Sequence, residues 1–277
     1  MAGLDALSTN LWSSFVDKVD DIIRAGLERL AADAGENGFG TSCENDLNRE
    51  LFFRMRRIAT ERHKSLLSLS PRPALSREHT WNLVPTSEAN NQPSPDDAER
   101  TPRENKRPDF QWSFQDDEAE DSDRATRTYV VECKRLGQAI GGWIFNANYV
   151  GHGVRRYVES SHLYGKDDVG GSMIGYVQSM DVETIWTEID RQLNSAGLAT
   201  LPQPAPILGS SVLHLASHHL SRLNALSPFQ LHHIWVDLRM LVCQSACKRD
   251  PLSARKRDPL TRWRKVDRTR AVALRAA

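Results

Sequence analysis

The sequence predicts an α/β protein with a central mixed β-sheet flanked by helices. Segments with helical periodicity come first, and strand-like apolar runs then alternate with further helical segments. The composition, 39% hydrophobic and 26% charged with no net charge, is ordinary for a globular chain and argues against a general, histone-like nucleic-acid binder. At 277 residues the chain is long enough to bury a sizeable core.

Two amphipathic helices are predicted in the first quarter of the chain. Residues 10–34 and 44–63 each place apolar side chains at helical spacing, and the glycines of 35–40 separate them. The first apolar stripe consists of Leu11, Phe15, Val19, Ile22, Ile23, Leu27 and Leu30, and the second of Leu47, Leu51, Met55 and Ile58. Each predicted helix therefore has one face suited to cover a sheet.

A β-hairpin is predicted between residues 109 and 135. Residues 109–114 are rich in aromatics, residues 128–135 are rich in β-branched and apolar side chains, and the acidic run between them is too polar for a core. Side chains alternate along a strand, so Glu132 and Lys134 point to the same face. Because opposite ends of antiparallel neighbours meet, Asp109 is expected beside Glu132.

The second half of the chain supplies further elements for the sheet. Residues 149–158 fit an amphipathic helix and residues 173–177 a buried strand. Asp181 is the expected N-cap of a helix that runs to Leu193. Two more strands, near 211–220 and 230–238, would complete the sheet.

The predicted hairpin brings two carboxylates and an ammonium group together. Mg²⁺ prefers oxygen ligands and usually keeps several waters, which suits one or two carboxylates and a substrate phosphate. A bound metal lowers the pKa of its water and neutralises charge that develops on phosphorus, while a nearby cation helps to hold the nucleophile. The pattern therefore favours phosphodiester hydrolysis, although a strand that ends Glu-Cys-Lys-Arg is also an ordinary solvated strand end.

Pro108-Asp109 and Glu132-Cys133-Lys134 together resemble the signature of the PD-(D/E)XK, or restriction-endonuclease-like, nuclease superfamily. The resemblance implies a restriction-endonuclease-like core within residues 1–242. It also implies that Asp109 and Glu132 bind Mg²⁺, with Mn²⁺ as a substitute, that the Cys133 carbonyl adds a ligand, and that Lys134 orients or activates the attacking water. In this superfamily the first core helix often supplies an acidic residue to the metal.

Glu44 is the better candidate for that additional acidic residue. It falls near the middle of the apolar stripe of its helix, whereas Glu50 falls well off it, and a carboxylate that faces a core needs a partner. A competing interpretation is equally open. Thr41-Ser42-Cys43-Glu44 has the pattern of a capping box, in which Glu44 would only satisfy backbone donors at the start of the helix.

Arg155 and Arg156 are candidate nucleic-acid-binding residues. Guanidinium groups fit phosphate oxygens, although an arginine pair on a helix is also common on a solvated face. Near the C-terminus, residues 243–277 carry eleven Lys or Arg against three Asp. This basic tail could contact a nucleic-acid backbone or be solvated. Residues 68–106, rich in Pro, Ser, Asn and Arg, are predicted to be a mobile surface insertion, with an interdomain linker as the alternative.

The resemblance implies a Mg²⁺-dependent endonuclease that acts on DNA in preference to RNA, in defence against foreign DNA or in repair. It also raises a homodimer or an ATPase partner subunit as candidate partners. The alternatives are a nuclease-like subunit that binds nucleic acid or a protein without cutting, and an assembly protein that docks through its N-terminal helix. Four scattered cysteines without a disulfide framework, no signal peptide and no long apolar span indicate a reducing cytoplasm and no membrane partner.

Overall fold

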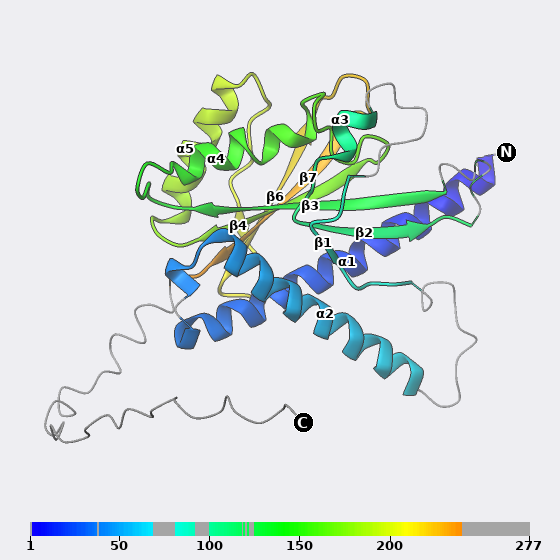
Figure 1. The fold of residues 1–277 in the computed structure, drawn as a ribbon, viewed down its shortest axis with the longest axis horizontal. Coiled ribbons are helices and arrows are strands. Elements are labelled where there is room, and N and C mark those ends of the chain that lie inside the picture. The colour runs from blue at the N-terminus through cyan, green and yellow to red at the C-terminus, as the bar shows by residue number, and fades with distance from the viewer. Residues whose placement is uncertain are drawn as a thin grey trace, which may run out of the picture.

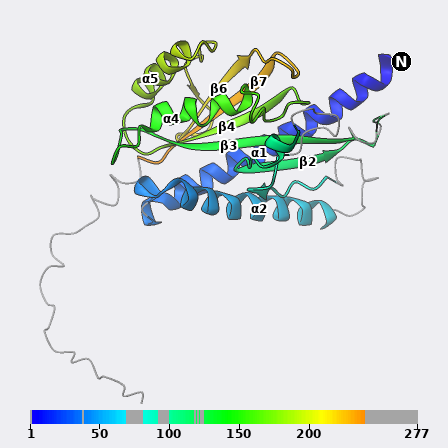
Figure 2. The same cartoon turned by 45° about the horizontal axis from the view of Figure 1, so that its top comes forward.

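A computed structural model describes residues 2–37, 39–68, 81–91, 100–117, 119, 121 and 125–239. The fold has three layers, in which helices cover both faces of one β-sheet (Figures 1 and 2). The sheet has seven strands in the order β1-β2-β3-β4-β7-β6-β5. The predicted α/β class with a mixed sheet between helices is therefore confirmed.

The sheet is antiparallel at both edges and parallel in its centre. β3 pairs with β4 and β4 with β7 in parallel, whereas β1-β2-β3 and β7-β6-β5 are antiparallel. The predicted hairpin is formed by β2 and β3, and the predicted late strands are β4, β6 and β7. The strands are β1 (Thr86–Ser87), β2 (Phe110–Gln115), β3 (Thr126–Leu136), β4 (Gly170–Val177), β5 (Ala205–Pro206), β6 (Leu213–Leu220) and β7 (Phe229–Asp237).

Two long helices cover one face of the sheet, in agreement with their apolar stripes. They are α1 (Ala2–Asn37) and α2 (Glu44–Ser68), joined through the short helix η1 (Phe39–Thr41), and both are longer than predicted. The apolar stripe residues from Phe15 in α1 and from Leu47 in α2 are all buried. The helices approach closely at Gly26, where a Cβ would lie 2.8 Å from Cγ of Met55. Glycine therefore permits this packing of α1 on α2.

The other face is covered by α4 (Phe145–Gly151), η4 (Val154–Tyr157) and α5 (Val182–Ser195). As predicted, Asp181 caps α5, and its carboxylate accepts a hydrogen bond from Thr184 N at 2.8 Å. The prediction of one helix over 149–158 is wrong, because α4 starts earlier and the chain turns after Gly151. A Cβ at Gly153 would lie 2.3 Å from the Tyr149 carbonyl oxygen, so glycine allows this tight turn.

Part of the segment predicted as an insertion belongs to the folded core. Its described residues, 81–91 and 100–106, include β1 at the edge of the sheet and α3 (Arg100–Glu104). Trp112 Nε1 donates to the Leu83 carbonyl at 2.9 Å, and the Trp81 ring packs against Phe114. The rest of that segment, and the predicted basic tail at 243–277, lie outside the described residues.

A buried polar network ties α1 to the sheet. Asp20 of α1 accepts hydrogen bonds from the Tyr129 hydroxyl at 3.1 Å and contacts His232 Nδ1 at 3.1 Å. The Tyr129 hydroxyl also lies 2.7 Å from Ser172 Oγ, so β3, β4 and β7 all take part. Although α1 has 36 residues, neither it nor any other described helix is long and apolar enough to cross a lipid bilayer.

Candidate active site

β3 carries two of the predicted site residues on one face, as its alternation requires. Glu132 and Lys134 are both buried, with Glu132 wholly inaccessible to solvent. Their neighbours Val131 and Cys133 point to the opposite face and join the core beneath α1 and α2. The strand therefore presents a carboxylate and an ammonium group side by side in the interior.

The Lys134 ammonium group is the centre of the cluster. Its Nζ donates to Glu132 Oε1 at 2.8 Å, to Glu44 Oε1 at 2.8 Å and to the Cys133 carbonyl at 2.6 Å. Glu44 reaches this point because it is the first residue of α2, and its other oxygen accepts from Arg135 N at 3.3 Å. Glu44 therefore contacts the cluster around Lys134, while Glu50 pairs with Arg54 outside it.

Asp109 enters the site from the residue before β2. Phe110 pairs with Val131, which places Asp109 next to Glu132 at the adjacent position of the hairpin. Oδ2 of Asp109 accepts from Cys133 N at 2.7 Å, and Oδ1 accepts from Asn48 Nδ2 at 2.9 Å. Both oxygens therefore have a fixed direction, one set by the strand and the other by α2.

Asn48 and Tyr176 are site residues that the sequence reasoning missed. The Tyr176 hydroxyl donates to Asn48 Oδ1 at 2.9 Å, and this fixes the amide so that its Nδ2 points at Asp109. A sequence signal for Asn48 was present, because Asn48 lies four residues after Glu44 and hence on the same helix face. Tyr176 is brought in only by the pairing of β4 with β3.

The predicted arginine pair is divided by the structure. Arg156 donates from a terminal guanidinium nitrogen to Glu132 Oε1 at 2.5 Å, whereas Arg155 is half exposed and pairs with Glu159 at 2.5 Å. Glu132 Oε1 thus receives both Lys134 and Arg156. The second oxygen, Oε2, is buried and has no hydrogen-bond partner among the described residues.

The charges of this cluster do not balance. Asp109, Glu132 and Glu44 can carry three negative charges, against two positive charges on Lys134 and Arg156. Burial raises the pKa of Asp109 well above its ordinary value, and the neighbouring charge of Glu132 raises it further. The site therefore favours either a proton on Asp109 or an additional cation.

Lys134 remains protonated despite its burial. Desolvation lowers its pKa, but the charges of Glu132, Asp109 and Glu44 together outweigh that effect and raise the pKa. Arg156 behaves in the same way, because burial lowers its pKa and Glu132 raises it. Both side chains therefore serve as fixed positive charges.

The oxygen donors at this point fit a hard divalent cation. Two carboxylates, one of them with an orphaned buried oxygen, lie beside the Cys133 carbonyl, and Mg²⁺ takes such donors while it keeps several waters. In the part of the chain that the structure describes, no three Asp, Glu, His or Cys side chains converge closely enough to hold a metal ion. The fit is thus to an open site with few protein ligands.

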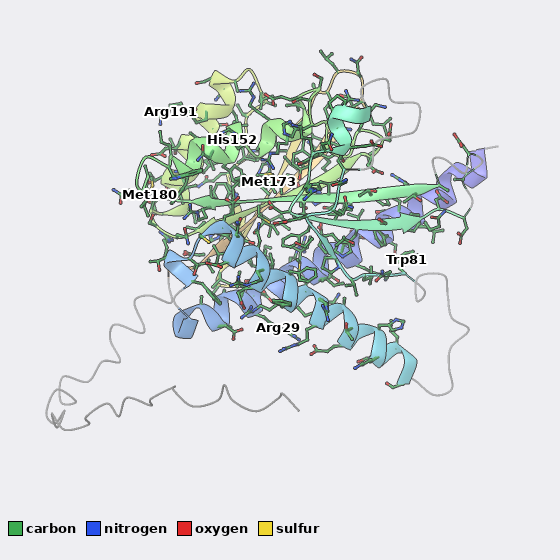
Figure 3. All side chains as sticks on the ribbon, in the orientation of Figure 1. Arg29, Trp81, His152, Met173, Met180 and Arg191 are labelled. Carbon is green, nitrogen blue, oxygen red and sulfur yellow. The ribbon has the colours of Figure 1, made fainter. Side chains whose placement is uncertain are left out.

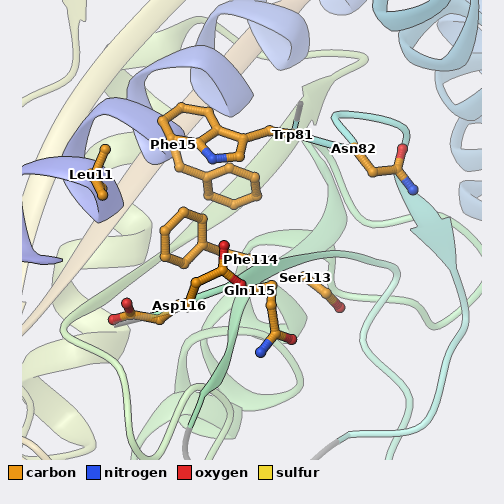
Figure 4. A pocket seen from close by; sticks show the side chains of 9 residues that line it. Leu11, Phe15, Trp81, Asn82, Ser113, Phe114, Gln115 and Asp116 are labelled. Atoms are coloured by element: carbon orange, nitrogen blue, oxygen red, sulfur yellow. The ribbon is translucent and has the colours of Figure 1, made fainter. Parts of the chain in front are cut away.

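A separate pocket of about 260 Å³ lies away from these carboxylates (Figure 4). Its walls come from α1, from Trp81 and from the end of β2, where Gln115 pairs with the start of β3 at Thr126. Met180 follows β4, at the end of that strand that lies beside Lys134. Trp81 and Met180 lie at opposite sides of the molecule (Figure 3). The pocket is therefore not part of the cluster around Lys134.

Comparison with known proteins gives no assignment. No protein-family model matches the chain, and neither a curated protein nor a solved structure matches it. The chemistry must therefore be inferred from the residues around Lys134.

Proposed function

We propose that this chain is a metal-dependent nuclease of the PD-(D/E)XK kind that hydrolyses phosphodiester bonds in DNA. The observation that carries the proposal is the convergence of Asp109, Glu132 and Lys134 at one buried point, with Glu132 Oε2 left without a partner. These residues come from two strands and supply the oxygen donors and the cation that such a reaction needs.

In this proposal Asp109 and Glu132 hold Mg²⁺, or Mn²⁺ in its place, with the Cys133 carbonyl and Glu44 as further oxygen donors. Bound there, the metal would supply Lewis acidity and would lower the pKa of a water. Water adds to phosphorus, the bond from phosphorus to one ester oxygen breaks, and the released oxygen takes up a proton. The reaction therefore balances without any oxidant or reductant.

The chain's own side chains have distinct tasks. Lys134 is a protonated donor, so it orients the attacking water and stabilises negative charge on the phosphate rather than removing a proton. Arg156 fixes the orientation of Glu132 through its 2.5 Å contact. Asn48 fixes Asp109, and Arg155, which is half exposed, is the candidate for a phosphate contact outside the buried cluster.

The test is cleavage by the purified full chain. Supercoiled plasmid, linear duplex, single-stranded DNA and RNA are incubated with Mg²⁺, Mn²⁺ or EDTA. We expect cleavage of DNA that requires the metal. Asp109→Asn, Glu132→Gln and Lys134→Met should each lower the rate by at least about a hundredfold, because each removes a group aimed at the reacting centre.

Glu50→Gln is the matched control, because Glu50 lies on the same helix as Glu44 but pairs with Arg54 outside the cluster. It should leave the cleavage rate unchanged. If the folded wild-type chain cleaves no nucleic acid with either metal, the enzyme proposal is wrong. Metal-independent binding of DNA without cleavage would then favour a nuclease-like subunit that has lost its activity.

A further inference from the structure

A short hairpin with a two-residue turn lies between β3 and α4. Ile140 and Trp143 exchange both backbone hydrogen bonds, at 3.1 and 3.0 Å. Gly141 and Gly142 between them have φ of +58° and +87°, which only glycine adopts readily and which a type I′ turn requires. Two hydrogen bonds hold the segment before it, because Gly137 N donates to Asn146 Oδ1 of α4 at 3.0 Å and Gln138 N donates to Ser179 Oγ, after β4, at 2.8 Å. The hairpin is therefore a preformed projection.

The hairpin exposes three large apolar side chains within five residues. Ile140 is 63% exposed, Trp143 62% and Ile144 58%. One exposed apolar side chain on a surface is ordinary, but a contiguous group that includes tryptophan marks an interaction site. Burial of this tip by a partner would therefore lower the free energy of the system.

The hairpin follows the strand that carries the proposed catalytic residues. β3 ends at Leu136, two residues after Lys134, and the hairpin starts at Ile140, beyond the end of the sheet where α2 begins (Figure 1). Arg135 follows Lys134 in β3 and so precedes the hairpin in the chain. Its guanidinium group lies 4.3 Å from the centre of the Phe145 ring. Among the described residues no carboxylate pairs with Arg135, so its charge is available to a phosphate.

These features favour nucleic acid over protein as the partner. Three side chains fall well short of the roughly 800 Å² that each partner contributes to a stable protein interface. The apolar side chains of the hairpin could instead contact bases, and the guanidinium group of Arg135, which pairs with no carboxylate among the described residues, could contact a phosphate. Apolar side chains that enter a base step unstack it and kink the duplex.

We infer that Ile140 and Trp143 insert between base pairs of duplex DNA beside the cleaved bond, with Arg135 on a neighbouring phosphate. This inference rests on the proposed function and specifies its substrate as a duplex that is unstacked locally. Duplexes with a mismatch or bulge near the cleaved bond should be preferred, because part of the unstacking cost is already met in them.

The experiment uses duplexes that carry 2-aminopurine, whose fluorescence rises when the base is unstacked. The wild-type chain is mixed with the duplex in Ca²⁺ or EDTA to prevent hydrolysis, and cleavage is then measured in Mg²⁺. We expect a rise in fluorescence with the wild type. The double variant Ile140→Ser, Trp143→Ser should lose this rise and bind about tenfold more weakly, as expected when base stacking on an aromatic side chain is lost.

Leu223→Ser is the matched control, because Leu223 is 85% exposed but lies between β6 and β7, at the opposite end of the sheet. It should behave as the wild type. Arg135→Gln should weaken binding to all sequences and reduce the salt dependence by about one counterion. All these positions are exposed or partly exposed, so an unchanged melting temperature confirms that each variant is folded.

The outcomes separate this inference from the nuclease proposal. If the wild type cleaves DNA and the double variant binds and cleaves equally well, the hairpin inference is wrong and the nuclease proposal stands. If the fluorescence rises but no DNA is cleaved, the hairpin inference stands and the nuclease proposal is wrong. If the double variant instead turns a dimer into a monomer in sedimentation while DNA binding is unchanged, a second copy covers the hairpin and the inference is overturned.

Discussion

Lys134 and Arg222 are both buried cations, but the structure holds them in opposite ways. Lys134 is surrounded by carboxylates, whose charges raise its pKa despite burial. The Arg222 guanidinium group donates only to backbone carbonyls and lies 4.0 Å from the centre of the Phe229 ring, and burial lowers its pKa to about 10. The carbonyls belong to Tyr164, Gly165, Lys166, Asp168 and Leu226.

The difference distinguishes a structural cation from a reactive one. The carbonyl groups around Arg222 are neutral and belong to loops, and Asp167 and Asp168 act on Arg222 only through their charges, so the hydrogen bonds of its guanidinium group hold these loops together. Around Lys134 the carboxylates outnumber the cations and one oxygen has no partner. That excess of negative charge favours a proton or a further cation at this cluster.

The largest effect on stability is expected from Arg222→Met. The substitution removes the guanidinium donor from five backbone carbonyls, of which those of Gly165 and Lys166 keep a second backbone donor, so the free energy of unfolding should fall by about 3–5 kcal/mol. Urea denaturation measures the change. Arg191→Met, on the exposed surface of α5, is the control and should stay within about 0.5 kcal/mol. If Arg222→Met and Arg191→Met were equally stable, the structural role proposed for Arg222 would be wrong.

Lys134→Met should cost less stability than Arg222→Met, and its effect should depend more strongly on pH. Without the ammonium group the pKa of Asp109 rises further above its value in the unfolded chain, because Lys134 is among the groups that lower it. The folded state then takes up a proton as the pH falls. A deficit of about 1–3 kcal/mol at pH 8 should therefore shrink toward pH 5.

The Arg222→Met deficit should change less over the same range, because the Arg222 guanidinium group forms its hydrogen bonds with backbone carbonyls, and Asp167 and Asp168 act on it only through their charges. Urea titrations of both variants between pH 5 and pH 8 make the comparison directly. A Lys134→Met deficit that grows toward pH 5 would contradict the excess of negative charge inferred for the site.

The smallest effect is expected from Asn48→Ala. It removes the amide that orients Asp109 but leaves every proposed metal ligand in place, so Mg²⁺ affinity should fall by about tenfold without loss of fold. Calorimetric titration with Mg²⁺ measures it. Asn45→Ala, an exposed neighbour on α2, should bind Mg²⁺ as the wild type does. An unchanged affinity in Asn48→Ala would mean that Asp109 does not contact the metal.

Local periodicity was enough to predict the part of the proposed site that lies on β2 and β3. Alternation along β3 determines that Glu132 and Lys134 share a face, and antiparallel pairing determines that Asp109 lies beside them. Both inferences depend on residues within about 25 positions of one another. The helical position of Glu44 was also predictable, although the sequence left its partner open.

The contacts that the sequence did not reveal come from longer range or from a local break in periodicity. Arg155 and Arg156 are adjacent in sequence, and only the turn at Gly153 decides which of them reaches Glu132. Tyr176 joins Asn48 because β4 pairs with β3 in parallel, across a connection that the motif does not describe. Trp81 lay in a segment whose composition suggested an insertion, yet its ring packs on the core.

The position of β7 between β4 and β6 has a consequence for synthesis of the chain. β4, which pairs with the strand that carries Glu132 and Lys134, has β7 as its other neighbour, and β7 is the last described strand. Until residues 229–237 have left the ribosome, β4 is an unpaired edge and the sheet is incomplete. A chain whose synthesis stops before β7 should therefore aggregate or be degraded.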